Sequence, residues 1–359
     1  MLNMQTVARI NAIAGALPPT DVDSNYRTWA QGHLSDPREA RLFGRMAERS
    51  GIEHRWSVLG EEASLEPGRF YTRDAQPTTA ERMAVYASEA PKLALQAIAR
   101  LPELGEVTHL VVASCTVFVA PGVDQVIARA LGLPNNVERV VVGFMGCYAG
   151  VTALRTAGHI VRSRPDARVL VVAVELCSLH LQADAGLEST LAMAQFSDGA
   201  AAAIVTADGM GLALGDGFSG MLEESDSLIT WTIGDTGFTM GLSGEVPARL
   251  AAALSEPEIA GTVLDGHGAE DIGAWAVHPG GKSILDAVER AFALPQGALA
   301  ESREVLRACG NMSSATILFV LEQIMARKPA NGVALAFGPG LAMEGFRFRW
   351  TEGDARQAA

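Results

Sequence analysis

The chain has 359 residues, 48% of them hydrophobic and 19% charged, which is ample for a large core in one big domain or two fused halves. Its formal net charge of −13 argues against nucleic acid and anionic membrane surfaces as general partners. No apolar stretch reaches the ~20 residues of a membrane span, and the N-terminus lacks a basic region followed by an apolar run. We therefore expect a cytoplasmic protein without a signal peptide.

Short apolar strands alternate with helices along the chain. In the first half we expect helices over 37–50, 79–100, 124–131, 147–164 and 187–195, and strands over 109–114, 139–142, 168–175 and 199–206, those at 109–114, 139–142 and 168–175 being buried. In the second half we expect strands over 211–214, 228–232, 274–277 and 333–337, and helices over 247–254, 284–293 and 314–326. The alternation predicts α/β layers with buried parallel or mixed sheets. A stretch rich in Gly, Asp and Ser near 206–226 divides the chain into two halves, 1–206 and 207–359.

The four cysteines are widely spaced, and no two of them form a Cys-x-x-Cys pair. They are Cys115, Cys147, Cys177 and Cys309, and each lies in or beside an apolar segment. This pattern is typical of reduced, buried thiols and not of disulfides or a zinc site. We therefore expect no metal site, and any special reactivity of one cysteine has to come from its local surroundings.

Three reactive side chains lie at similar places in the expected fold. Cys147 and His278 each follow a buried strand, and Asn311 precedes an apolar helix. Strand ends on a rigid sheet can aim such side chains at one point. Each residue also has a plainer interpretation, as a buried hydrophobic thiol, a turn histidine or a helix-capping asparagine. Their joint occurrence favours a Cys-His-Asn acyl-transfer enzyme.

The three residue types fit one kind of chemistry. Cys147 begins a helix, whose roughly half positive charge lowers the pKa of a thiol, and the thiolate can accept an acyl group as a thioester. His278 can hold the thiolate as an ion pair and donate to a carbonyl oxygen, and the Asn311 amide can donate to the same oxygen. Neutral donors suit charge that develops on an enolate oxygen. No carboxylate base is then required if decarboxylation produces the carbanion.

These segments resemble those of the type III polyketide synthases, the chalcone synthase-like branch of the thiolase superfamily, over about residues 38–348. The motifs that carry the resemblance are Gly143-Phe144-Met145-Gly146-Cys147, His278-Pro279-Gly280-Gly281, Gly310-Asn311-Met312-Ser313-Ser314 and Gly338-Pro339-Gly340. The resemblance implies a five-layered αβαβα thiolase fold of two similar halves, a homodimer, and CoA thioesters as substrates with no further cofactor. It implies an enzyme that decarboxylates malonyl-CoA, extends an acyl-CoA starter repeatedly and cyclises the product.

The resemblance also assigns roles to residues outside the triad. Phe196 and Phe238 correspond to two gatekeeping phenylalanines, although both would otherwise be ordinary core aromatics. Cys115, His180 and Ser313 align with positions that shape the cavity.

Two basic residues are candidates for binding CoA. Arg55 aligns with a CoA-contacting arginine, and Lys282 lies just past the His278 loop; either could equally be a solvated surface charge. The sequence departs from plant members at Ala120, where those carry a methionine that crosses the dimer interface. That particular contact is therefore not expected here.

Two segments, 175–182 and 231–235, look most like bacterial alkylresorcinol and alkylpyrone synthases, which hold long fatty acyl starters in an apolar tunnel. The alternatives within the fold are a tetrahydroxynaphthalene-type synthase that uses malonyl-CoA alone and a single-round enzyme like ketoacyl synthase III. A papain-like cysteine hydrolase and a non-catalytic thiolase-fold binding protein are further alternatives, which the mid-chain position of Cys147 and the intact triad disfavour. The starter, the number of extensions and the mode of cyclisation stay open.

Overall fold

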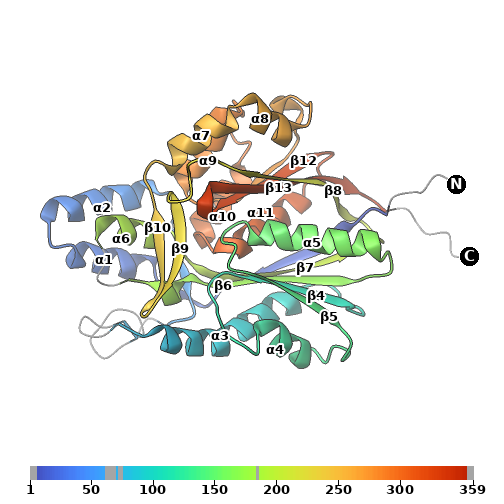
Figure 1. The fold of residues 1–359 in the computed structure, drawn as a ribbon, viewed down its shortest axis with the longest axis horizontal. Coiled ribbons are helices and arrows are strands. Elements are labelled where there is room, and N and C mark those ends of the chain that lie inside the picture. Colours follow the sequence, from blue (N-terminus) through green and yellow to red (C-terminus); the bar gives the residue numbers. More distant parts are fainter. Residues whose placement is uncertain (1–5, 61–69, 72–75, 183–185, 354–359) are drawn as a thin grey trace, which may run out of the picture.

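The computed structural model describes residues 6–60, 70–71, 76–182 and 186–353, and its centre is a nine-stranded mixed sheet (Figure 1). In order across the sheet, the strands are β11 (Trp275–Val277), β12 (Gly332–Gly338), β13 (Ala342–Thr351), β8 (Gly211–Met221), β1 (Arg9–Ala16), β7 (Asp198–Thr206), β6 (Val169–Leu176), β4 (His109–Ser114) and β5 (Glu138–Gly143). Strand β4 runs parallel to β5 and β6, and β11 runs parallel to β12. The other neighbouring pairs are antiparallel.

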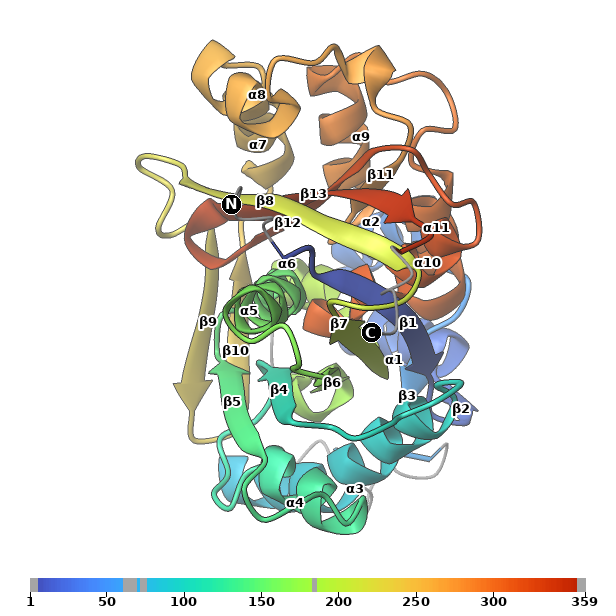
Figure 2. The same cartoon turned by 90° about the vertical axis from the view of Figure 1, so that its right-hand side faces the viewer.

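Helices and strands alternate in five layers, αβαβα (Figure 2). One outer layer consists of α3 (Thr79–Ala99) and α4 (Val123–Ala130), the central layer of α5 (Ala149–Ser163) and α11 (Thr316–Met325), and the other outer layer of α7 (Val246–Leu254), α8 (Pro257–Leu264), α9 (Lys282–Ala291) and α10 (Ala300–Cys309). Strands β1 and β4–β7 lie on one side of the central helices, and β8 and β11–β13 on the other. The α/β thiolase-type architecture expected from the sequence is thus confirmed.

The two parts of the sheet join at a narrow contact. Strand β1 pairs with β8 only through Arg9 with Ala213 and Ile10 with Leu212. The chain crosses there, from β7 to β8, at residues 207–210. Each side of the sheet buries its own apolar cluster against its outer helices, and a further cluster surrounds α5 and α11 between them. The division into halves at residue 206 stays a prediction.

The strands expected to be buried behave differently according to their place in the sheet. Every residue of β4 and β6 is buried, as their continuous apolar sequences predict for central strands. Strand β5 was expected to be buried as well, and this was wrong, because β5 is the edge strand of the sheet. Val140 is 41% exposed and Val141 50%. An edge strand with exposed valines offers unpaired backbone groups to another chain.

Two strands of the large sheet escaped the sequence analysis. Strand β1 reads Arg-Ile-Asn-Ala-Ile-Ala-Gly-Ala, which is rich in small residues and lacks clear alternation, and β13 is similarly mixed. Both are antiparallel to their neighbours along most of their length, β1 with β7 and β13 with β12 and β8. Tertiary pairing, and not intrinsic propensity, therefore determines these strands.

Smaller elements surround the end of the sheet where the reactive residues lie. These are α1 (Asp23–His33), α2 (Pro37–Arg49), α6 (Leu187–Met193), the two-stranded ribbon of β9 (Ile229–Gly234) and β10 (Gly237–Leu242), and the short pair β2 (Thr20–Asp21) and β3 (Trp56–Ser57). Helix α6 contacts both α2 and β10, so the ribbon and the N-terminal helices face each other across it (Figure 1). Among the described helices, none combines the length and hydrophobicity of a membrane span.

Candidate active site

Cys147 lies in a tight turn between edge strand β5 and helix α5. Phe144 has φ 59° and Gly146 has φ 82°, so the backbone turns sharply twice before the thiol. A Cβ atom on Gly146 would lie 2.3 Å from the Pro339 ring. Only glycine fits this position, because it tolerates both the left-handed backbone and the close approach. The turn brings the thiol to a position two residues before Ala149, the first residue of α5.

His278 and Asn311 come from the other side of the central helices, and hydrogen bonds join their loops. The His278 backbone N–H donates to Leu335 O at 2.8 Å, which extends β11 by one residue. The Asn311 amide Nδ2 donates to Gly280 O in the His278 loop at 3.2 Å, and its Oδ1 accepts from the Ser313 backbone N–H at 2.8 Å. These two bonds fix the orientation of the Asn311 amide with its nitrogen toward the His278 loop.

One cavity of about 1140 Å³ receives all three residues. Cys147, His278 and Asn311 line it together with Ser313, as the sequence predicts for residues that act at one point. The lining is mostly apolar and comes from α6, the ribbon and the start of α7, including Leu191, Ile229, Met240, Leu242 and Val246. Both ring nitrogens of His278 lack a hydrogen-bond partner among the described residues, so the imidazole is free to bind a substrate or the thiol.

Burial opposes charge on both members of the Cys147–His278 pair. Although the thiol opens onto the cavity, surrounding protein raises the pKa of Cys147 to about 11, and hydrogen bonds from the Ser313 and Asn311 side chains only partly offset this. Burial likewise lowers the pKa of His278 to about 3. These shifts favour a neutral thiol and a neutral imidazole. We predict that a thiolate forms when His278 takes the proton, since each charge then stabilises the other.

Glu175 is a buried residue of the site that the sequence analysis did not single out. It is the last residue but one of the apolar strand β6 and is fully buried. Its carboxylate accepts hydrogen bonds from the Cys115 backbone N–H at 3.0 Å, the Thr116 hydroxyl at 2.8 Å and the Ser314 hydroxyl. Burial raises the pKa of Glu175, and these bonds counteract the rise. The signal in the sequence is one acidic residue at the end of a strand that is otherwise wholly apolar.

Cys115 connects this carboxylate to the nucleophile turn. Its thiol accepts a hydrogen bond from the Gly146 backbone N–H at 2.9 Å, immediately before Cys147, and its side chain lines the cavity. Burial raises the pKa of the Cys115 thiol well above its usual range. Cys115 is therefore a neutral packing group beside Cys147 that also lines the cavity, and its role in cavity shape stays a prediction.

The two predicted gatekeeping phenylalanines lie in different places relative to the cavity. Phe196 lines the cavity, and its backbone bridges to Asn311. Phe238 was expected as the second gatekeeper and His180 as a residue that shapes the cavity; both are fully buried, and neither is among the residues that line the cavity. Side chains alternate along β10, so Phe238, Met240 and Leu242 share one face of the strand. Met240 and Leu242 line the cavity, whereas Phe238, two residues before Met240, does not.

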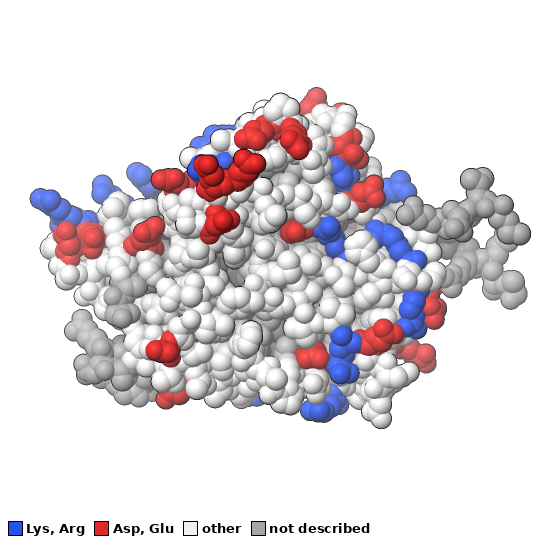
Figure 3. All heavy atoms as spheres, in the orientation of Figure 1, with Lys and Arg blue, Asp and Glu red and all other residues white. Residues whose placement is uncertain are grey.

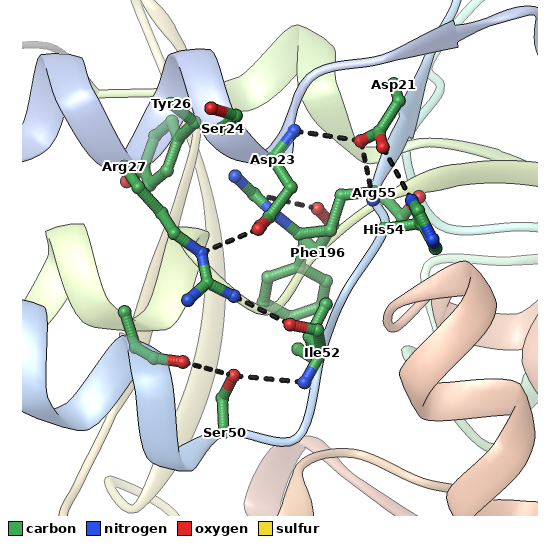
Figure 4. A network of polar contacts seen from close by, with 12 residues as sticks. Asp21, Asp23, Ser24, Tyr26, Arg27, Ser50, Ile52, His54, Arg55 and Phe196 are labelled. Atoms are coloured by element: carbon green, nitrogen blue, oxygen red, sulfur yellow. Dashed lines mark hydrogen bonds and ion pairs between the residues drawn. The ribbon is translucent and has the colours of Figure 1, made fainter.

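Arg55 was predicted to bind CoA, and the structure contradicts this role. Its side chain is only 3% exposed, forms an ion pair with Asp23 at 2.8 Å and lies over the Tyr26 ring (Figure 4). The guanidinium also donates to Met193 O at 2.9 Å and Phe196 O at 3.2 Å. Arg55 thus holds the segment that presents Phe196 and has no access to the cavity.

Two groups of basic residues remain near the cavity mouth. Lys282, the second CoA candidate, is exposed at the first residue of α9, beside the lining residues Gly280 and Ser283. Helix α2 carries an arginine stripe that the sequence analysis missed. The four exposed arginines of this stripe, whose side chains form no hydrogen bond or ion pair with the described residues, are Arg38, Arg41, Arg45 and Arg49.

The stripe lies next to the cavity. Spacings of three and four residues place the arginines on one side of α2, and Glu39 and Met46 of the same helix line the cavity. Basic side chains gather at the left end of the molecule in Figure 3, where α2 lies in Figure 1. The spacing of the arginines was the available signal in the sequence. Within the described ranges, no three His, Cys, Asp or Glu side chains are grouped as metal ligands.

The dependence of the thiolate on His278 leads to a test. His278 is the only imidazole among the described residues that line the cavity. Replacing it, as in His278→Gln, leaves a thiol whose pKa burial raises to about 11 with no neighbour to take its proton. Alkylation of Cys147 by iodoacetamide at pH 7 should fall about tenfold or more, and the rate should recover only as the pH rises toward that pKa.

The control for this test is His267→Gln, because His267 is exposed and lies outside the cavity. Labelling of Cys147 is followed by intact mass across pH 6 to about 10, a range that brackets ordinary thiol titration. Equal labelling rates for His278→Gln and the wild type at pH 7 would show that His278 does not activate the thiol.

Two family models match the chain from end to end. The model described as chalcone and stilbene synthases, N-terminal domain, matches residues 4–209, and the corresponding C-terminal domain model matches residues 214–351. The alpha-pyrone synthesis polyketide synthase-like Pks18 of Mycobacterium tuberculosis is 33% identical, over 96% of this chain and 91% of that protein. Bisdemethoxycurcumin synthase of Oryza sativa subsp. japonica is 32% identical, over 94% of this chain and 91% of that protein.

Solved structures agree with the sequence relatives. The C-terminal type III polyketide synthase domain of Steely1 from Dictyostelium has a TM-score of 0.86 at 27% identity, over 96% of this chain and 99% of that one. PKS-I from the brown alga Ectocarpus siliculosus has a TM-score of 0.87 at 28% identity, over 97% of this chain and 100% of that one. The chain therefore belongs to the chalcone and stilbene synthase family of type III polyketide synthases, which are acyltransferases with a thiolase-type fold.

Proposed function

We propose that this protein condenses malonyl-CoA repeatedly onto a fatty acyl-CoA starter and cyclises the product to an alkylpyrone or alkylresorcinol. The observation that carries the proposal is the meeting of Cys147, His278 and Asn311 in one largely apolar cavity of about 1140 Å³. The name of the mycobacterial relative, an alpha-pyrone synthesis polyketide synthase-like protein, supports the pyrone product. The apolar lining from α6 and the ribbon supports an aliphatic starter.

The loading step uses the thiol and the imidazole. His278 takes the thiol proton, and the Cys147 sulfur attacks the carbonyl carbon of the starter thioester. The C–S bond to CoA then breaks, the CoA thiolate leaves with the proton from His278, and the starter remains on Cys147 as a thioester. Hydrogen bonds that develop to the carbonyl oxygen during attack stabilise the charge there.

The extension step uses the neutral donors. The thioester oxygen of malonyl-CoA accepts hydrogen bonds from the His278 imidazole and the Asn311 amide. The Asn311 amide is oriented by its own hydrogen bonds to Gly280 O and from the Ser313 N–H. Loss of CO2 leaves its electron pair on the enolate, which the two donors stabilise. The enolate carbon attacks the acyl group on Cys147, and the C–S bond breaks to return the thiolate.

Mass spectrometry tests this function directly. The protein is incubated with malonyl-CoA and with starters from acetyl-CoA to long-chain acyl-CoA, and we expect CoA release, CO2 loss and cyclised products that contain two or more malonyl-derived units. Cys147→Ala should abolish extension and retain some decarboxylation, because His278 and Asn311 remain. Products with one added unit alone would favour an enzyme like ketoacyl synthase III, and products from malonyl-CoA without a starter would favour a tetrahydroxynaphthalene-type synthase.

We further propose that the arginine stripe of α2 binds the phosphates of CoA. The chain is acidic overall, so a row of four exposed arginines at the cavity mouth is the local positive potential that an anionic carrier requires. Arginine suits phosphate because its planar guanidinium donates two parallel hydrogen bonds. Lys282 lies at the first residue of α9, beside lining residues Gly280 and Ser283, and could contribute as well.

The double substitution Arg45→Glu with Arg49→Glu should raise KM for malonyl-CoA about tenfold or more, because each lost phosphate contact is worth roughly 1.5–3 kcal/mol. The value of kcat should change little, since neither residue touches the reacting atoms. Malonyl-N-acetylcysteamine, which lacks the nucleotide, should react equally with variant and wild type. Arg349→Glu is the control, because Arg349 is exposed on β13 outside this cavity. An unchanged KM for malonyl-CoA would contradict the assignment.

We also propose a homodimer formed through strand β5. This edge strand exposes Val140 and Val141, and Phe118, on the loop after β4, is 73% exposed. Two copies of β5 paired about a two-fold axis would satisfy the free backbone groups and cover these side chains.

A lysine on the edge strand tests the dimer. Val141→Lys should convert the protein to a monomer, because a charged side chain at an edge opposes strand pairing. The molar mass is measured by sedimentation or light scattering. Met221→Lys is the control, since Met221 is also apolar and is even more exposed than Val141, but lies on β8. A wild-type monomer, or a dimer that survives Val141→Lys, would contradict this interface.

A further inference from the structure

Segment 195–197, which follows helix α6, pairs with the backbone of Asn311 on both sides. The Asn311 backbone N–H donates to Gln195 O at 2.8 Å, and the Ser197 backbone N–H donates to Asn311 O at 2.9 Å. Phe196, between them, forms a parallel bridge with Asn311. This segment therefore places the backbone from which the Asn311 amide projects, and a shift of the segment would move the amide with it.

The buried side chain of Arg55 contacts both partners of this bridge. Its guanidinium donates to Met193 O at 2.9 Å and to Phe196 O at 3.2 Å. Its aliphatic stem packs on the other partner, because a Cβ atom on Gly310, the residue before Asn311, would lie 3.1 Å from Arg55 Cγ. Arg55 thus lies against the bridge without lining the cavity itself.

The residue after Arg55 adds two hydrogen bonds to the same segment. The Trp56 backbone N–H donates to Ser197 Oγ at 2.6 Å, and the Ser197 hydroxyl donates to Trp56 O at 3.2 Å. Strand β3 and segment 195–197 are consequently joined at two adjacent positions, by the Arg55 side chain and by the Trp56 backbone.

Helix α1 fixes the guanidinium of Arg55 in turn (Figure 4). The Arg55 Nε–H donates to Asp23 Oδ1 at 2.8 Å, and the guanidinium carbon lies 4.4 Å from the centre of the Tyr26 ring. The side chains of this ion pair are only 3% and 8% exposed, so water cannot replace either partner. A planar guanidinium can bond a carboxylate and carbonyl oxygens in different directions at once, and it thereby links the position of α1 to segment 195–197.

We propose that Arg55 is a positioning residue for decarboxylation, which acts through segment 195–197 on the Asn311 amide. The inference rests on the proposed function and adds a residue that serves one of its steps without touching the substrate. A donor stabilises an enolate oxygen only at hydrogen-bond distance, so a displacement of about 1 Å removes much of its effect. This role differs from the CoA contact that the sequence suggested, because it predicts an effect on kcat and not on KM.

Arg55→Met tests the proposal, because it removes the three side-chain hydrogen bonds of Arg55 and keeps an unbranched stem beside Gly310. Asp23 retains its ion pair with Arg27 at 2.6 Å, so its buried carboxylate is not left without a partner. Release of CO2 from malonyl-CoA is measured with Cys147→Ala as the parent protein, in which we expect decarboxylation without extension. We expect kcat to fall about tenfold or more while KM changes less than about twofold.

Two matched variants separate positioning from stability. Arg27→Met removes the other arginine from Asp23. Within the described part of the chain, the Arg27 side chain makes no hydrogen bond to segment 195–197, so this variant should keep the kcat of the parent. Arg55→Lys keeps the charge beside Asp23 but loses the planar fork, and its kcat should lie between those of Arg55→Met and the parent. Thermal unfolding verifies that each variant is folded.

Hydrogen exchange tests how firmly Asn311 is held without any reaction. Peptides that contain the backbone N–H groups of Ser197 and Asn311 are followed by mass spectrometry. These amides should exchange about tenfold faster or more in Arg55→Met, because the bonds between them open more often, and at the parent's rate in Arg27→Met. If the parent releases no CO2 from malonyl-CoA, the proposed function fails, and this exchange still decides whether Arg55 holds Asn311.

The proposal is overturned if folded Arg55→Met keeps the kcat of the parent, or if the exchange of Ser197 and Asn311 is unchanged. A higher KM with an unchanged kcat would assign Arg55 to CoA binding instead. An equal fall in kcat for Arg27→Met would also overturn it, because loss of charge around Asp23, and not the hold on segment 195–197, would then be responsible.

Discussion

The site depends on one buried carboxylate, that of Glu175. It accepts hydrogen bonds from Cys115, Thr116 and Ser314, which belong to segments far apart in the sequence. A buried charge without partners is costly, so the fold is stable only when the loop after β4 and the segment after Asn311 both reach the end of β6. The hydrogen bonds of Glu175 therefore hold the loop after β4 and the segment after Asn311 together at the end of β6.

Rigidity in this site has a chemical purpose. Decarboxylative condensation needs donors that already point at the enolate oxygen, because reorganisation during the reaction would forfeit part of their effect. Asn311 is oriented by both ends of its amide, and Cys147 by a turn that only glycine permits at Gly146. Both ring nitrogens of His278, by contrast, are buried without a hydrogen-bond partner among the described residues, which leaves them available for the proton exchange that we propose.

Different elements supply the polar groups and the apolar wall of the cavity. The ends of β5 and β11 and the segment after α10 supply the reactive groups, whereas the β9–β10 ribbon and α6 supply the apolar wall, and α2 lies at the mouth. Because β9 and β10 form a separate two-stranded sheet, one side chain of this cavity wall can be substituted without disturbing the nine-stranded sheet. Relatives of this chain have names that specify products as different as an alpha-pyrone and bisdemethoxycurcumin.

The sequence by itself determined the family, the α/β layers and the three polar residues that meet in one cavity, because glycine-lined motifs at strand ends are local features whose spacing is readable. It also indicated Cys115, Phe196 and Ser313 correctly as cavity residues. Only the tertiary structure decided that Phe238, His180 and Arg55 are buried, that β5 is an edge strand, and that Trp231 and the α2 arginines adjoin the cavity. Burial and strand register depend on partners distant in the chain, and no local pattern records them.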